Sequence, residues 1–265
     1  MFCCLFSGNN KHEYIFYSNA THISYVPVDG GESTAVLSAQ SANLGYDEQN
    51  YRLWYHVGVT LHSAKLDASD LQTVLVPSNF EKFTVDGVNQ SIYYMDKEGN
   101  TVKSIDYDGN HFPEIAALQS DEDFKDLQID PYNRSLFFTT DQMNSRNLIR
   151  YNLAEGTIHS INDNPSGIGT HLAVDTVNKT VYWILFTIET NYNIYKTTYD
   201  GQTSQIESDQ TGSVNTVDIA EGDGFFYIFD STTSKVSKYD KTTDMVVSTI
   251  SLSPGAERII VVAGK

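Results

Sequence analysis

Hydrophobic and polar positions alternate along most of the chain in short runs separated by polar turns, a pattern typical of β-strands. One segment recurs: an apolar residue, an aspartate, a polar turn, then a run built around two adjacent aromatic residues. Its clearest copies are VDGVNQSIYYMD (Val85–Asp96), IDPYNRSLFFTTD (Ile129–Asp141), VDTVNKTVYWIL (Val174–Leu185) and VDIAEGDGFFYIFD (Val217–Asp230). The repeated aspartates are Asp86, Asp130, Asp175 and Asp218, spaced by 44, 45 and 43 residues. A repeat of this length with several strands per unit indicates a β-propeller.

The aromatic pairs extend the repeat over the whole chain. They are Phe16-Tyr17, Trp54-Tyr55, Tyr93-Tyr94, Phe137-Phe138, Tyr182-Trp183 and Phe226-Tyr227. After each pair come a polar turn, a second alternating run, a turn that is often Asp-Gly, and a last short apolar run. The unit is therefore four antiparallel strands. We predict an all-β, six-bladed β-propeller that occupies residues 1–265 as a single domain.

Packing and capping account for the two most regular features. The aromatic pair lies on the second strand, where its two side chains would fill the spaces toward the neighbouring blades. The repeated aspartate is interpreted as a cap for backbone amides of the following turn. The C-terminal run Glu257–Gly264 resembles another first strand, and we expect Ile259–Val262 to pair in the first blade beside N-terminal residues. Phe2–Ser7 is the other candidate for that position, and which segment is innermost stays open.

Composition restricts the partners and the compartment. The formal net charge is −17, so nucleic acid and anionic membranes are disfavoured as partners. The two cysteines, Cys3 and Cys4, are adjacent and form no disulfide framework. The N-terminal segment lacks the features of a signal peptide and no stretch has the length of a membrane span. These features favour a cytoplasmic over a secreted protein. The compartment and the oligomeric state stay open.

The repeat resembles the YWTD repeat of the low-density lipoprotein receptor class B propeller, which has six blades in that family. The versions of its tetrapeptide here are FYSN, WYHV, YYMD, FFTT, YWIL and FYIF, so none is complete. The basic residue that precedes the Asp-Gly turn in that family is present as Arg150 and Lys196. The resemblance implies a six-bladed fold and a binding role. The cysteine-rich modules that accompany the receptor propellers are absent from this chain.

The same resemblance places candidate ligand-binding residues at the mouth of the central channel, four residues before each repeated aspartate. These positions are Lys82, Asp126, His171 and Val214, with Glu81 and Asn215 adjacent. By the same offset Arg258 joins them if the C-terminal strand is innermost. Such a mixed set of basic, acidic and imidazole groups could bind a polar ligand or a partner's side chain. The alternative is a solvated rim that binds nothing.

Three functions remain open, one of which is a purely structural or storage role that nothing in the sequence excludes. No motif of a nucleotide-binding, hydrolase, zinc or redox site occurs, so we expect a non-enzymatic binding module for a protein or carbohydrate partner, without a cofactor. The alternative is a calcium-dependent hydrolase or lactonase, in which Asp126, Asn215, Glu81 and His171 converge on one ion. Asp126 is the candidate metal ligand, and acidic loops at Ser120–Asp126 and Asn162–Asn164 invite the same interpretation.

Overall fold

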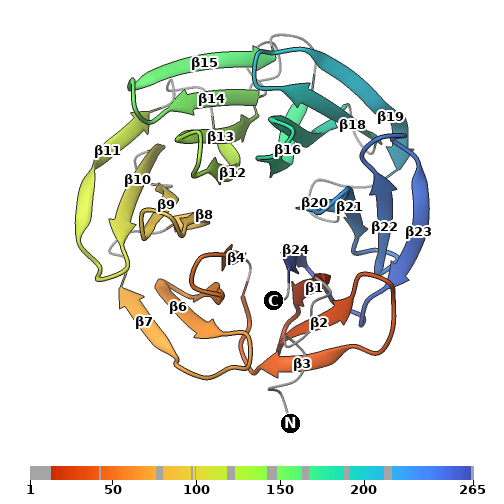
Figure 1. Ribbon diagram of the computed structural model, residues 1–265, viewed down its shortest axis with the longest axis horizontal. Coiled ribbons are helices and arrows are strands. Elements are labelled where there is room, and N and C mark those ends of the chain that lie inside the picture. Colours follow the sequence, from red (N-terminus) through yellow and green to blue (C-terminus); the bar gives the residue numbers. More distant parts are fainter. Residues whose placement is uncertain are drawn as a thin grey trace. The chain divides into compact units, whose positions relative to one another are not determined.

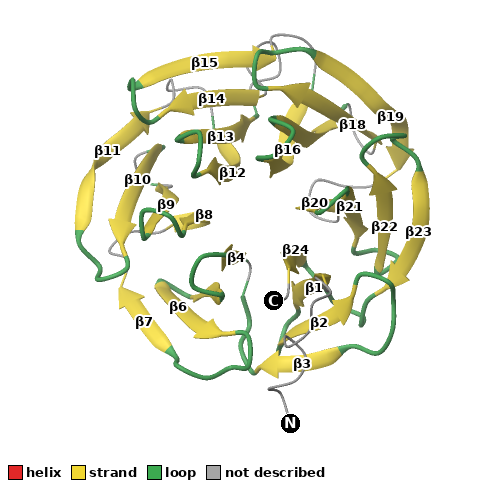
Figure 2. Cartoon of the chain, viewed as in Figure 1, coloured by secondary structure: helices red, strands yellow, loops and turns green. Residues whose placement is uncertain are grey.

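The computed structural model describes residues 13–41, 43–75, 80–96, 98, 100–117, 123–141, 148–162, 167–187, 191–211 and 217–263. All regular structure in these residues is β-strand, as Figure 2 shows. The strands form six four-stranded antiparallel sheets, so the prediction of an all-β, six-bladed β-propeller is confirmed. The residues divide into two compact units, unit 1 (Met1–Leu75 with Ala220–Lys265) and unit 2 (Val76–Ile219).

Unit 1 contains three of the sheets. In the order in which neighbouring strands are hydrogen-bonded, they are β24 (Arg258–Ala263), β1 (Glu13–Ser18), β2 (Ile23–Pro27) and β3 (Thr34–Leu37); β4 (Leu44–Asp47), β5 (Arg52–Val57), β6 (Thr60–Lys65) and β7 (Gln72–Leu75); and β20 (Val217–Gly222), β21 (Phe225–Asp230), β22 (Lys235–Asp240) and β23 (Val246–Ser251). The boundary between the two units falls inside β20.

The C-terminal strand completes the first blade. β24 pairs antiparallel with β1, with Ile259 opposite Tyr17 and Val262 opposite Tyr14. The predicted pairing of Ile259–Val262 beside N-terminal residues is therefore confirmed. β24 holds the edge position that β4 holds in its own sheet, which makes it the first strand of this blade (Figure 1). The other candidate, Phe2–Ser7, lies outside the described residues.

Unit 2 contains the other three sheets. They are β8 (Phe80–Asp86), β9 (Ser91–Asp96), β10 (Thr101–Asp106) and β11 (His111–Ala117); β12 (Phe124–Asp130), β13 (Ser135–Thr140), β14 (Leu148–Asn152) and β15 (Thr157–Asn162); and β16 (Ile168–Asp175), β17 (Thr180–Phe186), β18 (Asn191–Thr198) and β19 (Thr203–Thr211). Within this unit the first strands β8, β12 and β16 lie side by side (Figure 1).

The aromatic pairs pack as the alternation of a β-strand requires. Phe137 and Phe138 are adjacent in β13 and therefore point to opposite faces of their sheet. Phe137 belongs to a buried cluster with Trp183 of β17, and Phe138 to a separate cluster with Tyr93 of β9. Both rings are fully buried. Each would contribute on the order of 2 kcal/mol by burial alone, so the pairs join neighbouring sheets without any need for a ligand.

Candidate functional site

The first strands of unit 2 bring three of the predicted site residues together. Lys82, Asp126 and His171 each lie four residues before the last residue of β8, β12 and β16, respectively. The Lys82 ammonium (Nζ) lies 3.7 Å from Asp126 Oδ1, and His171 Nδ1 lies 3.8 Å from Asp126 Oδ2. Because β8, β12 and β16 are neighbours, one register position on three strands becomes one site.

Asp218 lies elsewhere in the repeat than its sequence pattern indicated. It was expected to match Asp86, Asp130 and Asp175 at the end of a first strand. However, β20 continues to Gly222, so Asp218 lies four residues before the strand end. Its Oδ1 atom lies 3.5 Å from His171 Nδ1. Asp218 therefore corresponds in position to Lys82, Asp126 and His171.

A shorter turn accompanies this shift. Four residues separate the first and second strands in the three sheets of unit 2, but only Asp223 and Gly224 separate β20 from β21. Gly224 has φ +73°, as the tight two-residue hairpin requires. An alignment on the aspartates therefore runs four residues out of register in this blade, and the shorter turn accounts for two of them. The predicted positions Val214 and Asn215 lie outside the described residues.

The four side chains form a buried group that we call the first-strand cluster: Lys82, Asp126, His171 and Asp218. Their exposed fractions are 12%, 9%, 4% and 9%. Main-chain amides also contribute: Asp126 Oδ1 accepts the Leu127 N–H and its Oδ2 the Leu172 N–H, at 3.0 and 3.1 Å. Asp218 Oδ1 accepts the Ile219 N–H at 3.0 Å. Asp126 thus connects β12 to β16 as well as to Lys82 of β8.

The remaining predicted site residues are distributed differently. Arg258 is the first residue of β24 in unit 1, opposite Ser18 of β1. Glu81 is part of β8, but its side chain, like Val214 and Asn215, lies outside the described residues. Two buried polar residues at the equivalent register position, Asp218 and Asn43, were missed by sequence reasoning. The Asp-Gly pair at Asp223 and Gly224, a signal for a two-residue hairpin, could have revealed the first of them.

The aspartates at the ends of the first strands hold the following turns. Asp130 Oδ1 accepts the N–H groups of Tyr132 and Asn133, both at 2.9 Å, and its Oδ2 accepts the Asn133 side-chain amide at 2.7 Å. Asp86 and Asp175 make the corresponding bonds to Asn89 and Asn178. Asp47 of β4 does the same in unit 1. These carboxylates accept backbone N–H groups of the turns and thereby stabilise the turns.

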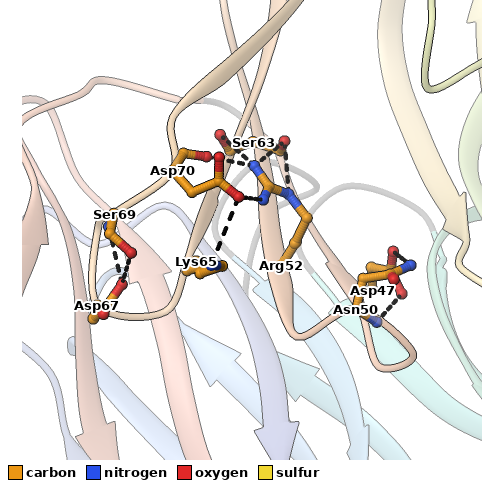
Figure 3. Close-up of polar contacts among 8 residues, drawn as sticks. All are labelled: Asp47, Asn50, Arg52, Ser63, Lys65, Asp67, Ser69 and Asp70. Carbon is orange, nitrogen blue, oxygen red and sulfur yellow. Dashed lines mark hydrogen bonds and ion pairs between the residues drawn. The ribbon is translucent and has the colours of Figure 1, made fainter. Parts of the chain in front are cut away.

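Two arginines illustrate how other polar side chains are used within single blades. In unit 1, buried Arg52 donates to Asp70 Oδ2 at 2.6 Å and to Ser63 Oγ at 3.0 Å (Figure 3). The bond from Arg52 lowers the pKa of the Asp70 carboxyl. In unit 2, Arg150 of β14 donates to Ser135 Oγ of β13. Arg150 lies at the position in its strand that Ser63 holds in β6, so the arginine and the serine have exchanged strands. Both arginines join two strands of one sheet and so serve the fold.

Metal-binding and membrane-spanning features are not found in the described part of the chain. Among those residues, no three or more His, Cys, Asp or Glu side chains are arranged to hold a metal ion. No described helix is long and apolar enough to cross a membrane. The predicted acidic loops fall largely outside the described residues. Asp123, one of their described members, forms an ion pair with Lys125. The Lys125 ammonium also pairs with Asp141, at 2.9 Å.

Comparison with known proteins identifies the fold. No protein-family profile matches the sequence, and no curated protein matches it. A chain of the crystal structure of a nidogen/laminin complex is similar over 94% of this chain and 98% of its own length, with a TM-score of 0.78 and 13% identity. TolB from Acinetobacter baumannii gives a TM-score of 0.70 with 12% identity, over 97% of this chain and 67% of TolB. Virginiamycin B lyase from Staphylococcus aureus gives 0.60 with 16% identity, over 88% and 78%. At these identities the likeness is one of fold.

Proposed function

We propose that this chain is a non-enzymatic binding module that presents one face to a protein or carbohydrate partner. The observation that carries the proposal is the pairing inside the first-strand cluster. Its carboxylates face an ammonium group, an imidazole and backbone amides, all supplied by the chain itself. A general base or nucleophile must instead direct a lone pair at a substrate. The cluster is better suited to holding adjacent first strands together.

The comparison supports a binding role only by analogy. The similar nidogen/laminin chain was crystallised in a complex between proteins, as the name of that structure states. A six-bladed propeller can also carry enzymes, and the similar virginiamycin B lyase is one by its name. Fold alone therefore does not decide between the two roles, and the decision rests on the chemistry of the site.

The alternative function is a calcium-dependent hydrolase or lactonase, and one observation favours it. Asp126 and Asp218 both approach His171 within 4 Å, which gathers two carboxylates and an imidazole in one place. Calcium needs six to eight oxygen ligands, however, and Lys82 holds a positive charge beside Asp126. An ion at Asp126 would have to displace this ammonium group or share the carboxylate with it.

Thermal unfolding distinguishes the two functions. The chain is treated exhaustively with EDTA, and its midpoint is measured before and after the addition of millimolar Ca²⁺, with Mg²⁺ as the control. A ligand that binds only the folded state raises the midpoint by mass action. We expect no calcium-specific rise in the wild type. A rise that Asp126→Asn abolishes, together with hydrolysis of ester or lactone substrates, would establish the alternative.

A further inference from the structure

Three turns of unit 2 expose an apolar side chain at the same position. Val88, Tyr132 and Val177 each lie two residues after the aspartate that ends β8, β12 or β16. Their exposed fractions are 46%, 60% and 86%. Single exposed apolar residues are ordinary, but one repeated at a fixed position on three neighbouring blades requires an explanation.

The backbone of these turns is held in one conformation. In each turn the aspartate accepts backbone and side-chain N–H groups of the asparagine three residues later. The last turn residue, Gln90, Arg134 or Lys179, has a positive φ of 49° to 52°. The apolar side chain at the tip is consequently presented from a fixed turn rather than from a loose loop.

The three turns are also joined to one another. Arg134 Nη1 donates to Asp86 Oδ2 at 2.7 Å, which links the second turn to the first. The Tyr199 hydroxyl donates to Asp130 Oδ2 at 2.8 Å, and the Tyr199 N–H donates to the Lys179 carbonyl at 3.1 Å. Tyr199 thereby links the second turn to the third. Burial and the nearby Asp130 charge raise the pKa of Tyr199, so the hydroxyl keeps the proton that it donates to Asp130.

We propose that these tips form a docking surface for an acidic polypeptide segment that also carries aliphatic or aromatic side chains. We call it the three-turn surface: Val88, Tyr132 and Val177 with Arg134 and Lys179. This inference rests on the proposed binding function and specifies which face is used. The surface lies at the opposite ends of the first strands from the first-strand cluster, roughly 13 Å away along a strand of four residue steps.

Charge identifies the occupant. The chain as a whole is strongly acidic, but the strand-end aspartates beside these turns are fully buried. The charged residues of the turns GVNQ, PYNR and TVNK are Arg134, which is paired with Asp86, and Lys179, which is exposed. The corresponding turns of unit 1 carry Glu48 after β4 and Asp223 after β20, and no apolar residue at the tip. A partner's carboxylate is therefore attracted by Lys179 of unit 2, whereas Glu48 and Asp223 in the turns of unit 1 repel it. The rigid turns lose little conformational entropy on binding, which favours affinity.

A displayed library of short linear peptides of unbiased composition tests the proposal. Selection on the wild-type chain is expected to enrich peptides that combine Asp or Glu with Leu, Phe or Tyr. The combined variant Val88→Ser, Tyr132→Ser and Val177→Ser is expected to weaken a selected peptide about tenfold or more. Lys179→Glu, which alters one exposed charge, is expected to weaken acidic peptides and to spare neutral ones.

A matched control removes exposed apolar groups from another surface. Met245→Ser with Val247→Ser alters residues of 65% and 53% exposure in and before β23, and it should leave peptide binding unchanged. Thermal unfolding of all variants shows whether each one is folded. The circular dichroism of the combined variant should match that of the wild type, because the substituted side chains are exposed.

Other outcomes would overturn the proposal. Selected peptides that are basic, or that bind the combined variant as tightly as the wild type, would assign binding to another face while leaving the binding function intact. Concentration-dependent self-association that the combined variant abolishes would identify a second copy as the occupant. Glycan binding lost in the same variant would identify a carbohydrate. Failure to enrich any peptide or glycan would remove both the docking surface and the proposed binding function.

Discussion

The turn between β20 and β21 in unit 1 and the first turns of unit 2 obtain their caps from different places. In unit 2 the first strand ends in an aspartate whose own side chain accepts the turn amides, as Asp130 does. In unit 1, β20 ends in Gly222, where a Cβ atom would lie 2.9 Å from Val261 Cγ1 and 3.1 Å from Tyr227. No side chain fits there. Instead, Glu13 of β1 supplies the carboxylate and accepts the Asp223 N–H at 2.6 Å.

The difference shows that capping and display are coupled. A four-residue turn with its own aspartate projects a tip residue, and three such tips make the three-turn surface. In the two-residue turn of Asp223 and Gly224, the position two residues after the strand end is Gly224, which has no side chain to project. The turn also depends on Glu13, a side chain from another strand. Burial raises the pKa of the Glu13 carboxyl, and the charge of Asp223 adds to this effect. The shorter turn thus lacks a projecting side chain and relies on a partly buried carboxyl from β1.

Removal of a local cap should have the largest effect on stability. Asp130→Ala withdraws a fully buried carboxylate from the Tyr132 and Asn133 amides and leaves the Tyr199 hydroxyl without its acceptor. We expect a loss of about 3 kcal/mol in the free energy of unfolding, measured by urea denaturation. A loss below roughly 1 kcal/mol would contradict a capping role.

The control for this prediction is Asp240→Ala. Asp240 accepts the N–H groups of Thr242 and Thr243 in a solvent-exposed turn of unit 1. It therefore makes a similar pair of bonds without burial, and water can replace it. The loss should be clearly smaller than for Asp130→Ala. Equal losses would show that burial of the cap adds nothing.

Installation of a local cap in β20 should be the next largest effect, and it should be unfavourable. Gly222→Asp places at the strand end the residue that ends β8, β12 and β16, but its Cβ would overlap Val261 and approach the Glu13 carboxylate. We expect a loss of about 2 kcal/mol in urea denaturation, from overpacking. Gly222→Ala, which adds only the Cβ, should account for most of it. Stabilisation by Gly222→Asp would show that a local cap has room at this position, so lack of space would not explain why Glu13 caps the turn.

The smallest effect concerns the pH dependence of the imported cap. A carboxyl whose pKa is higher in the folded than in the unfolded state stabilises the fold below its ordinary value of 4.5, and this contribution is lost as the pH rises through the folded pKa. Glu13→Gln removes the titration and keeps an oxygen for the Asp223 N–H. The stability of the variant relative to wild type should therefore increase between about pH 4 and about pH 7.

Urea denaturation across this range measures the difference, with Glu48→Gln as the control. Glu48 is an exposed carboxylate in the corresponding turn after β4, and its replacement should change the pH dependence little. A Glu13→Gln variant that loses stability relative to wild type as the pH rises would show that the ionised carboxylate is favourable in this position.

The sequence predicted the repeat well because the repeat is set by packing. Alternating apolar residues and aromatic pairs fix four strands per blade, and the short apolar run at Ile259–Val262 fixes the strand that joins β1. The prediction from sequence failed at Asp218 because an apolar residue followed by aspartate occurs at two different positions along the first strands: at the strand end and four residues before it. Lys82, Asp126 and His171 were singled out by a constant offset, whereas Asp218 was hidden because it lies four residues before the end of β20 rather than at that end.

Bonds between blades could not be predicted from the sequence at all. Arg134 reaches Asp86 and Tyr199 reaches Asp130 across 48 and 69 residues of chain. No local pattern distinguishes these side chains from the other arginines and tyrosines of the chain. The three-turn surface depends on such bonds and on exposure, so it became visible only when the turns of neighbouring blades were seen together.

Hydrogen–deuterium exchange on the complex with a selected peptide tests the central claim most directly, because it reports which end of the first strands is covered. The account predicts slower exchange at residues 87–90, 131–134 and 176–179 on addition of the peptide, with little change in the corresponding turn after β20. Slower exchange confined to the segments around Lys82, Asp126 and His171 would contradict it and return the binding site to the first-strand cluster.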